Sequence, residues 1–199
     1  ATAKTELART LRWYRRFLRV PIPPSQAMFA IVQGGLFKEL RREAIAAINK
    51  LSVFGTAIGG ALGKSKRQMY QIISWVMEHS DRSRPHHLLG VGDTESIPEI
   101  IRLGVDLFDC ALPTRIARHG TALTKNGPLD ITRGMFKNAF RPVERGCACA
   151  VCNRYTIAQL NFLFKAREPL AGRLLTIHNL YFIEQMLVGI RKQIESGKF

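Results

Sequence analysis

The sequence is short of acidic residues. Its 199 residues include 15 Asp and Glu but 30 Lys and Arg, so the formal net charge is +15 at pH 7. An excess of one sign this large repels itself in a compact protein unless a polyanion neutralises it. We therefore expect an anionic partner, with RNA as the first candidate and an anionic membrane surface as the second.

Long apolar runs are missing, and cysteines are few. No apolar run reaches the roughly 18 residues that a membrane-spanning helix needs. Of the four cysteines, three fall within the stretch 147–152, which favours a metal site over a disulfide framework. Free thiols also indicate a reducing intracellular compartment, either cytoplasmic or mitochondrial.

Short apolar segments alternate with helical patterns in the first part of the chain. Strand patterns cover residues 28–32, 56–58, 86–89 and 105–108. Helical patterns lie between them, at about 37–50, 66–79 and 95–103. This alternation is typical of βα units with a parallel sheet, in which reactive groups gather at the carboxyl ends of the strands.

Asp109 directly follows the fourth strand pattern, within the stretch GVDLFDCALPTRIARHG at 104–120. Arg115 and Arg118 come shortly after it. A carboxylate at a strand end with guanidinium groups nearby suits chemistry on a phosphate-bearing substrate. On these residues alone, an ordinary surface aspartate remains the other interpretation.

A metal site is the clearest local signal. Residues 121–132 predict a hairpin, the stretch CACAVC follows at 147–152, and His178 lies in a later helical pattern. Three thiolates and one imidazole make a closed tetrahedral zinc site, which is structural because no position remains for water. We predict that this zinc is bound by Cys147, Cys149, Cys152 and His178. A buried core histidine is the other interpretation of His178.

The first helical pattern, residues 5–19, is strongly basic. Its arginines fill the positions between apolar residues at helical spacing, and they are Arg9, Arg12, Arg15, Arg16 and Arg19. The pattern favours a surface that faces RNA, although charged helix faces are more often simply solvated.

Seven stretches together resemble the C-terminal part of the tRNA-guanine transglycosylase, or queuine tRNA-ribosyltransferase, family. They are RTLRW (9–13), IVQGG (31–35), AIGG (57–60), LLGVG (88–92), FDCALPTR (108–115), CACAVC (147–152) and TIHN (176–179). The family folds as a (β/α)8 barrel with a zinc-bearing insertion, and it exchanges guanine in certain tRNAs for queuine or its precursor. The resemblance implies an α/β fold with about four βα units of a TIM-type barrel at 1–120. A hairpin, a zinc-binding extension and C-terminal helices are then expected at 121–199.

The resemblance also implies roles for single residues. Asp109 resembles the nucleophile that attacks the ribose anomeric carbon and displaces guanine through a covalent ester. Gln33 and Gly60 match positions that recognise the purine edge with an amide and a backbone group. Arg115 and Arg118 match positions near the bound anticodon loop. The four predicted zinc ligands match those of the family in full.

The matching stretches leave the first half of the barrel unaccounted for. Four strands cannot close a (β/α)8 barrel, so we expect an open half-barrel whose edges a second polypeptide or an RNA covers. Lys64 also stands about where the family has a pocket glutamate. No membrane is among the expected partners.

Two functions therefore stay open. The chain is either part of a transglycosylase whose first half is separate, or a non-catalytic descendant that binds tRNA or rRNA. The second function would suit a structural subunit of a ribonucleoprotein such as a mitochondrial ribosome. Whether the chain is an enzyme is not decided by these residues.

Overall fold

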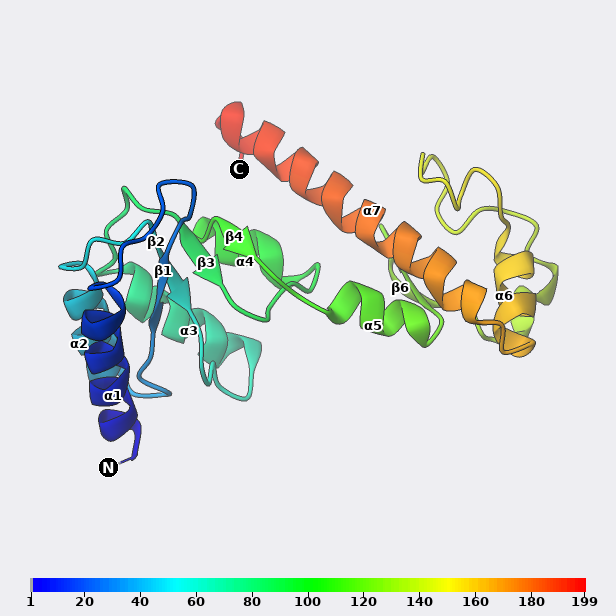
Figure 1. Cartoon of the computed structure of the whole chain (residues 1–199). Coiled ribbons are helices and arrows are strands. Elements are labelled where there is room, and N and C mark those ends of the chain that lie inside the picture. The colour runs from blue at the N-terminus through cyan, green and yellow to red at the C-terminus, as the bar shows by residue number, and fades with distance from the viewer. Residues whose placement is uncertain (1) are drawn as a thin grey trace. The chain divides into compact units, whose positions relative to one another are not determined.

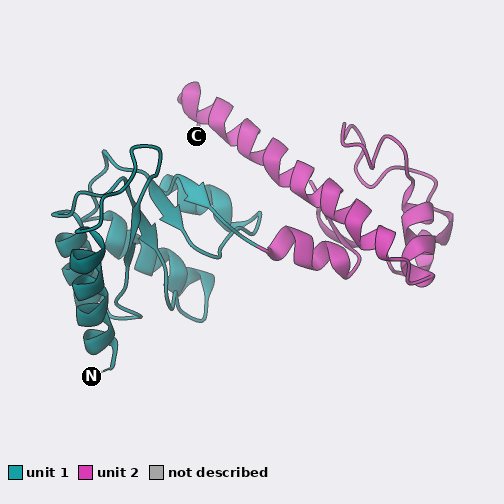
Figure 2. Cartoon of the chain, viewed as in Figure 1, with its two compact units in different colours: residues 1–110 teal, residues 111–199 magenta. Residues whose placement is uncertain are grey.

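The computed structural model describes residues 2–199, and the chain divides into two compact units (Figures 1 and 2). The first unit comprises residues 1–110 and the second comprises residues 111–199. Each unit has a hydrophobic core of its own.

The first unit alternates helices with strands along the chain. Its elements are α1 (Thr2–Phe17), β1 (Phe29–Val32), α2 (Lys38–Ile48), β2 (Gly55–Ile58), α3 (Lys66–Met77), β3 (His86–Leu88), α4 (Ser96–Arg102) and β4 (Leu107–Phe108). The strands form one parallel sheet in the order β1-β2-β3-β4. Sequential order with an intervening helix is the arrangement of neighbouring βα units in a TIM-type barrel. The expected α/β fold with four such units is confirmed.

Burial explains why these short segments form strands. All four residues of β2 are buried, as expected for an inner strand of a parallel sheet that is covered on both faces. Ala30, Val32 and Leu88 of the flanking strands are fully buried as well. Apolar residues of α2 and α3, including Ile45 and Ile73, complete this core. The sheet is therefore fixed by a continuous apolar interior.

The outer edge of β1 is partly covered by the chain itself. In the described residues, β1 pairs with β2 on one side only. On its other side, the Tyr14 hydroxyl of α1 donates to the Ile31 carbonyl oxygen at 2.9 Å and accepts a hydrogen bond from the Ile31 N–H. Burial raises the pKa of Tyr14, which keeps this hydroxyl protonated. At Ile31 the edge therefore needs no further strand to satisfy its backbone.

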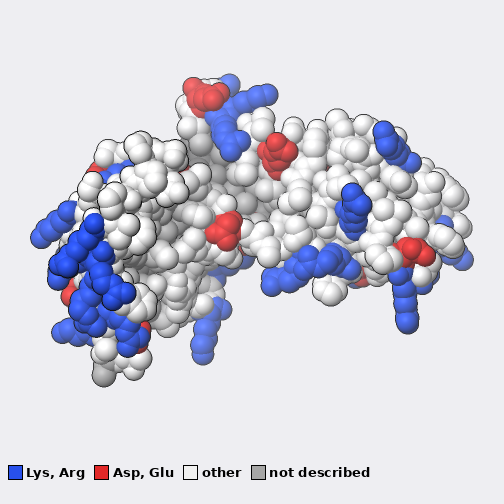
Figure 3. Space-filling view, in the orientation of Figure 1, with Lys and Arg blue, Asp and Glu red and all other residues white. Residues whose placement is uncertain are grey.

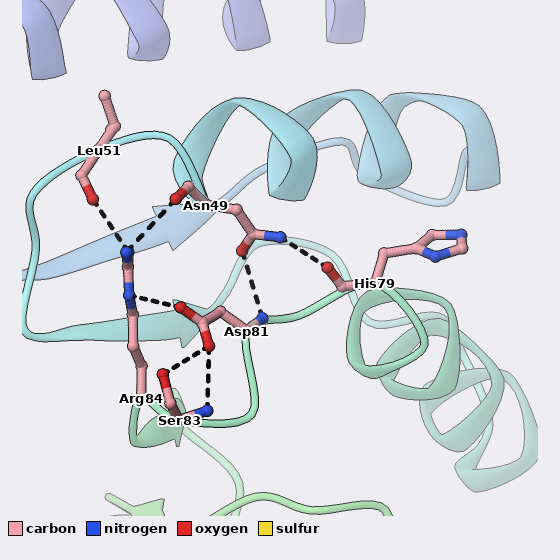
Figure 4. A network of polar contacts seen from close by, with 6 residues as sticks. All are labelled: Asn49, Leu51, His79, Asp81, Ser83 and Arg84. Carbon is pink, nitrogen blue, oxygen red and sulfur yellow. Dashed lines mark hydrogen bonds and ion pairs between the residues drawn. The ribbon is translucent and has the colours of Figure 1, made fainter.

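A polar network joins the connections that lead into β2 and β3 (Figure 4). The Arg84 guanidinium donates to the carbonyl oxygens of Leu51 at 3.0 Å and Asn49 at 3.4 Å, and its Nε lies 3.0 Å from Asp81. Asp81 Oδ1 in turn accepts hydrogen bonds from the Ser83 hydroxyl at 2.6 Å and the Ser83 N–H at 3.1 Å. These contacts fix the amino ends of the strands, opposite to the edge at which a site is expected.

The second unit is built around one long helix. Its elements are α5 (Leu112–Arg118), β5 (Thr121–Thr124), β6 (Gly127–Asp130), the 3-10 helix η1 (Gly134–Asn138), α6 (Ile157–Lys165) and α7 (Pro169–Glu195). Strands β5 and β6 form the predicted antiparallel hairpin. Helix α7 begins with Pro169 in its first turn, where a missing N–H does no harm, and packs against α5, α6 and β5.

Helix α6 begins with a capping box. The Thr156 hydroxyl accepts a hydrogen bond from the Gln159 N–H, and the Gln159 side chain accepts one from the Thr156 N–H. This arrangement satisfies backbone donors that the first turn of a helix leaves free. The chain between η1 and α6 therefore enters the helix at a fixed point, with the cysteine stretch lying just before it. In residues 2–199, none of the helices has both the length and the apolar character of a transmembrane span.

Acid should weaken the first unit through Asp81. Hydrogen bonds from Ser83 lower the pKa of this carboxylate below its ordinary value of 3.8. A carboxylate whose pKa is lowered by folding stabilises the fold above its ordinary pKa, and that stabilisation is lost as the pH falls through the folded-state pKa. We expect Asp81→Asn to lower the melting temperature by a few degrees at pH 7, and the difference to shrink below the ordinary pKa. Thermal unfolding from pH 7 to pH 2 measures both.

Glu43→Gln is the matched control, because Glu43 is exposed on α2 and the replacement changes the net charge by the same amount. An Asp81→Asn protein that melts like the Glu43→Gln protein at every pH would contradict the prediction.

Candidate active site and metal centre

The candidate residues of the first unit lie at one edge of the sheet. Gln33 follows the last residue of β1, Gly59 and Gly60 follow β2, and Asp109 follows β4. Because all four strands are parallel, their carboxyl ends open on the same side. The structure therefore brings Gln33, Gly60 and Asp109, which lie far apart in the sequence, to a common edge.

Gln33 and Gly60 are close neighbours there. Gly60 has a φ of +77°, and a Cβ added to it would lie 2.9 Å from Gln33 Oε1. Only glycine readily allows this conformation together with so close an approach. The half-buried carboxamide of Gln33 and the exposed backbone of Gly60 thus offer donors and an acceptor side by side, which suits the edge of a planar heterocycle.

A third residue at this edge, Arg41 of α2, could not be recognised from the sequence. Its side chain is fully buried, and burial lowers its pKa to about 10. Nη1 donates to the carbonyl oxygens of Val32 and Gly59, both at 2.9 Å. Nε donates to Gly35 at 2.9 Å and Nη2 to Ala61 at 3.0 Å. In the described chain, the hydrogen-bond partners of this side chain are thus all carbonyl oxygens, of the last residue of β1 and of the loops after β1 and β2.

Asp109 is held through one of its two carboxylate oxygens. Oδ1 accepts a hydrogen bond from the Gly90 N–H at 3.2 Å and lies 3.0 Å from His87 Nε2. The Phe29 ring lies edge-on to the His87 imidazole, with 6.1 Å between ring centroids. Among residues 2–199, Oδ1 makes both polar contacts of the Asp109 carboxylate, and the Asp109 side chain is 59% exposed. The carboxylate is therefore oriented through Oδ1, while Oδ2 has no hydrogen-bond partner among residues 2–199.

His87 was missed in the sequence, although a signal for it existed. It lies in β3, and its register partner Leu107 is two residues before Asp109 on the neighbouring strand. Because β3 and β4 are neighbours in the sheet, a histidine in β3 can contact an aspartate that directly follows β4. This contact could be predicted only once the order of the strands was known.

Lys66, the first residue of α3, contacts the loop after β3. Its Nζ lies 2.9 Å from Asp93 and 2.6 Å from Glu95, and these carboxylates raise its pKa. Lys64 takes a different place: its backbone N–H donates to the Gln68 side chain at 2.8 Å, and the residue is exposed. In the part of the chain that the structure describes, Lys66 rather than Lys64 makes the ionic contacts of this edge.

Arg115 and Arg118 lie on α5 in the second unit, and both are exposed. Arg118 Nη1 donates to the Thr114 hydroxyl at 3.4 Å. Among residues 2–199, neither arginine forms an ion pair with a carboxylate, so both guanidinium groups are available to an anion. A Cβ added to Gly172 of α7 would lie 3.3 Å from the Arg118 Cα, so α5 is packed tightly on the long helix.

Helix α1 presents a second set of exposed arginines, visible as a blue cluster over this helix (Figure 3). Leu7 is buried in the core, whereas Arg12, Arg15 and Arg16 on the other face are exposed. Glu6 is paired with Arg9 at 2.7 Å. The helix is therefore amphipathic as predicted, and its outer face is basic.

The predicted metal ligands form one group in the second unit. The ligand atoms of Cys147, Cys149, Cys152 and His178 all lie within 4.8 Å of one another. His178 Nδ1 is 3.9, 3.6 and 3.4 Å from the three sulfurs in that order. A tetrahedral zinc ion with usual bond lengths separates nitrogen from sulfur by about 3.6 Å. The group therefore has the ligand set and spacing to hold a metal ion of this kind.

Contacts around the group orient the ligands. His178 Nε2 lies 2.9 Å from the Leu123 carbonyl oxygen, and donation by Nε2–H leaves the Nδ1 lone pair directed at the sulfurs. The Cys152 N–H donates to Cys149 Sγ at 3.3 Å. Next to His178, Asn179 Oδ1 accepts the Leu123 N–H at 2.8 Å. Both backbone groups of Leu123 in β5 are thus bonded to α7, the carbonyl oxygen to His178 and the N–H to Asn179.

Burial makes this group dependent on a cation. It raises the pKa of the Cys152 thiol to about 12 and also raises the pKa of Cys147. It lowers the pKa of His178, which favours the neutral imidazole that metals bind. Thiolates this close together repel one another, so a positive ion is required to hold them deprotonated.

The family model for queuine tRNA-ribosyltransferase matches residues 1–199 of the chain. The chain is 43% identical over 194 residues to the queuine tRNA-ribosyltransferase of Protochlamydia amoebophila, which covers 96% of the chain and 50% of that protein. It is 40% identical over 198 residues to the Natranaerobius thermophilus protein of the same name, covering 98% and 54%. For the Pelotomaculum thermopropionicum protein, identity is 42% over 199 residues, covering 100% and 53%. The chain spans about half the length of the curated relatives it matches.

Replacing one ligand should release the metal. We expect about one metal ion per wild-type chain, and much less in Cys149→Ser, because three ligands bind far more weakly than four. Loss of the ion should lower the melting temperature of the second unit by at least about 5 °C. Elemental analysis and thermal unfolding, with and without a chelator, measure these effects.

Cys110→Ser is the control, since Cys110 lies in the first unit and outside the cluster. A folded wild-type protein without metal, or equal metal content in Cys149→Ser and Cys110→Ser, would refute the assignment.

Proposed function

Because the chain belongs to the queuine tRNA-ribosyltransferase family, we propose that it supplies the nucleophile and part of the base pocket of a tRNA-guanine transglycosylase. The reaction exchanges guanine in tRNA for queuine or its precursor. The observation that carries the proposal is the largely exposed carboxylate of Asp109, which is oriented through Oδ1 at the carboxyl edge of the sheet. Gln33 and Gly60 lie at the same edge.

In the first step, Asp109 Oδ2 attacks the ribose anomeric carbon. The bond from this carbon to the guanine nitrogen breaks, and guanine leaves with the bonding electron pair and gains a proton. A carboxylate suits this role because it can trap an oxocarbenium-like centre as a glycosyl ester. The incoming base then loses a proton, attacks the same carbon and displaces Asp109. Two displacements at one carbon give net retention.

Gln33 and Gly60 serve to recognise the base. The Gln33 carboxamide can both donate and accept, and the Gly60 N–H can only donate. In the described residues the Gly60 N–H has no hydrogen-bond acceptor, so it is free for a ligand. Gln33 Oε1 lies close to Gly60, which supports the proposal that both residues contact the same edge of one purine.

Zinc is the metal we propose for the second unit. Cys147, Cys149, Cys152 and His178 would hold it, and the fourfold protein ligation makes its role structural. It would hold the cysteine stretch and the hairpin against α7. No step of the exchange runs through it.

The tRNA substrate accounts for the charge of the chain. The formal net charge is +15, and Arg115 and Arg118 expose guanidinium groups that no carboxylate of residues 2–199 neutralises. Phosphate contacts of this kind fix the position of an RNA without recognising its sequence. We assign Arg115 and Arg118 to such contacts.

The rest of the barrel has to come from a further polypeptide segment. The sheet of residues 2–199 has four strands, half of those in a (β/α)8 barrel, and the chain covers about half of its relatives. We propose that this segment completes the barrel around the four-stranded sheet and supplies the remaining pocket residues.

Asp109→Asn should abolish the exchange of radiolabelled guanine by the native assembly, with a loss of at least about a thousandfold. It should also abolish the covalent RNA adduct, because an amide oxygen is a poor nucleophile for this carbon. Gln33→Ala should differ: it should raise the KM for the base and leave adduct formation largely intact. Glu43→Gln serves as the control, since Glu43 is exposed on α2, away from the candidate residues.

The alternative is a non-catalytic RNA-binding subunit, which the net charge of +15 favours. Full RNA binding by the native assembly without any guanine exchange would establish it and rule out the enzyme. Exchange that disappears in Asp109→Asn would rule out the alternative.

Arg115→Ala and Arg118→Ala should each weaken tRNA binding and flatten its salt dependence. Each lost phosphate contact lowers the slope of log K against log salt by about one, because fewer counterions are released. Arg102→Ala is the control, since this guanidinium is already paired with Glu99 at 2.7 Å. Equal salt slopes in all three variants and the wild type would remove both arginines from the interface.

A further inference from the structure

Arg41 makes its contacts at the two residues that precede the proposed base-recognition groups. A single nitrogen, Nη1, bridges the carbonyl oxygens of Val32 and Gly59. Each carbonyl belongs to the peptide group whose N–H is that of the next residue, Gln33 or Gly60. The buried guanidinium therefore holds both recognition residues through the peptide groups that lead into them.

The peptide between Gly59 and Gly60 shows what this contact does. A peptide group is planar and trans, so its C=O and N–H point in opposite directions. Because the Gly59 carbonyl is directed at the buried Arg41, the Gly60 N–H is directed away from it. A charged donor on the carbonyl also polarises the peptide group, which makes the N–H at its other end a stronger donor.

The same guanidinium fixes how far apart the two loops lie. Nε holds Gly35 in the loop after β1, and Nη2 holds Ala61 in the loop after β2. Gly34, in the loop after β1, also lies close to the backbone of Arg41. Its φ is +139°, and a Cβ added to it would lie 2.8 Å from the backbone nitrogen of Arg41. Both loops are thus anchored to one residue of α2.

Holding loops together does not by itself call for a buried cation. In residues 2–199 no carboxylate pairs with Arg41, and an unpaired buried charge is costly. Apolar packing would join two loops at lower cost. A positive charge beneath the Gly59–Gly60 peptide is useful if that peptide must donate to an electron-rich atom of a ligand.

We propose that Arg41 is a positioning residue for base recognition: it fixes Gln33 and Gly60 at one spacing and strengthens the Gly60 N–H as a donor to an acceptor atom on the purine edge. This inference rests on the proposed function. It assigns to Arg41 an effect on base affinity and none on the nucleophile, because its hydrogen bonds reach only the loops after β1 and β2.

The test compares Arg41→Lys and Arg41→Met with Arg42→Met in the native assembly. Arg42 is exposed and adjacent on the same helix, so it controls for the loss of an arginine. We expect the KM for guanine to rise about tenfold in Arg41→Lys, which keeps the charge but loses the planar fork, and further in Arg41→Met. The rate of RNA adduct formation at Asp109 should stay near that of the wild type. Arg42→Met should behave like the wild type throughout.

A second measurement does not depend on activity. In the isolated chain labelled with 15N-glycine, the Gly60 amide proton should shift upfield in both Arg41 variants, because the peptide is less polarised. It should not move in Arg42→Met.

The outcomes separate this inference from the proposed function. Guanine exchange by the wild type with an unchanged KM in both Arg41 variants would overturn the inference alone. An unmoved Gly60 amide, or variants that unfold by circular dichroism, would overturn it as well. A wild-type assembly with no exchange would overturn the proposed function and this inference together.

Discussion

The site of the first unit depends on hydrogen bonds to loop carbonyls that no regular structure satisfies. Parallel strands end at one edge, and the loops that follow β1 and β2 there each contain a pair of adjacent glycines, which have no side chains to hold them. Arg41 meets this need with donors to four carbonyl oxygens from a fully buried position. The loops after β3 and β4 are held by different means. Lys66 pairs with Asp93 and Glu95 after β3, and His87 contacts the Asp109 carboxylate after β4. At this edge of the sheet, charged side chains thus order loops that are rich in backbone groups.

The amino ends and the carboxyl ends of the strands differ in how their polar groups are satisfied. At the amino ends, the network of Asp81, Ser83 and Arg84 closes on itself, and each of its polar groups finds a partner within the chain. At the carboxyl ends, by contrast, Asp109 Oδ2 and the Gly60 N–H are among the groups that have no hydrogen-bond partner within residues 2–199. This distribution is expected where one end of parallel strands stabilises the fold and the other end carries the chemistry.

The second unit is small, comprising residues 111–199. A unit of this length buries little apolar surface, and α7 alone cannot hold a hairpin and an irregular cysteine stretch. The Cys3His group brings together segments that are far apart in the sequence, and Asn179 adds hydrogen bonds beside it. The candidate metal group thus lies where the cysteine stretch, the hairpin and the long helix α7 meet.

The sequence by itself determined the features that depend on local spacing. Strand and helix periods predicted the four βα units, the turn residues predicted the hairpin, and the cysteine spacing with His178 predicted the metal group. Asp109 was found because a polar residue directly after an apolar strand is visible in the sequence. Only the tertiary structure revealed Arg41 and His87. Arg41 looks like any arginine of a basic helix, since its partners are backbone carbonyls, which carry no signature in the sequence. His87 meets Asp109 only because β3 and β4 are neighbours. Periodic patterns report on neighbours along the chain, whereas these two side chains are defined by loops that the fold brings to them.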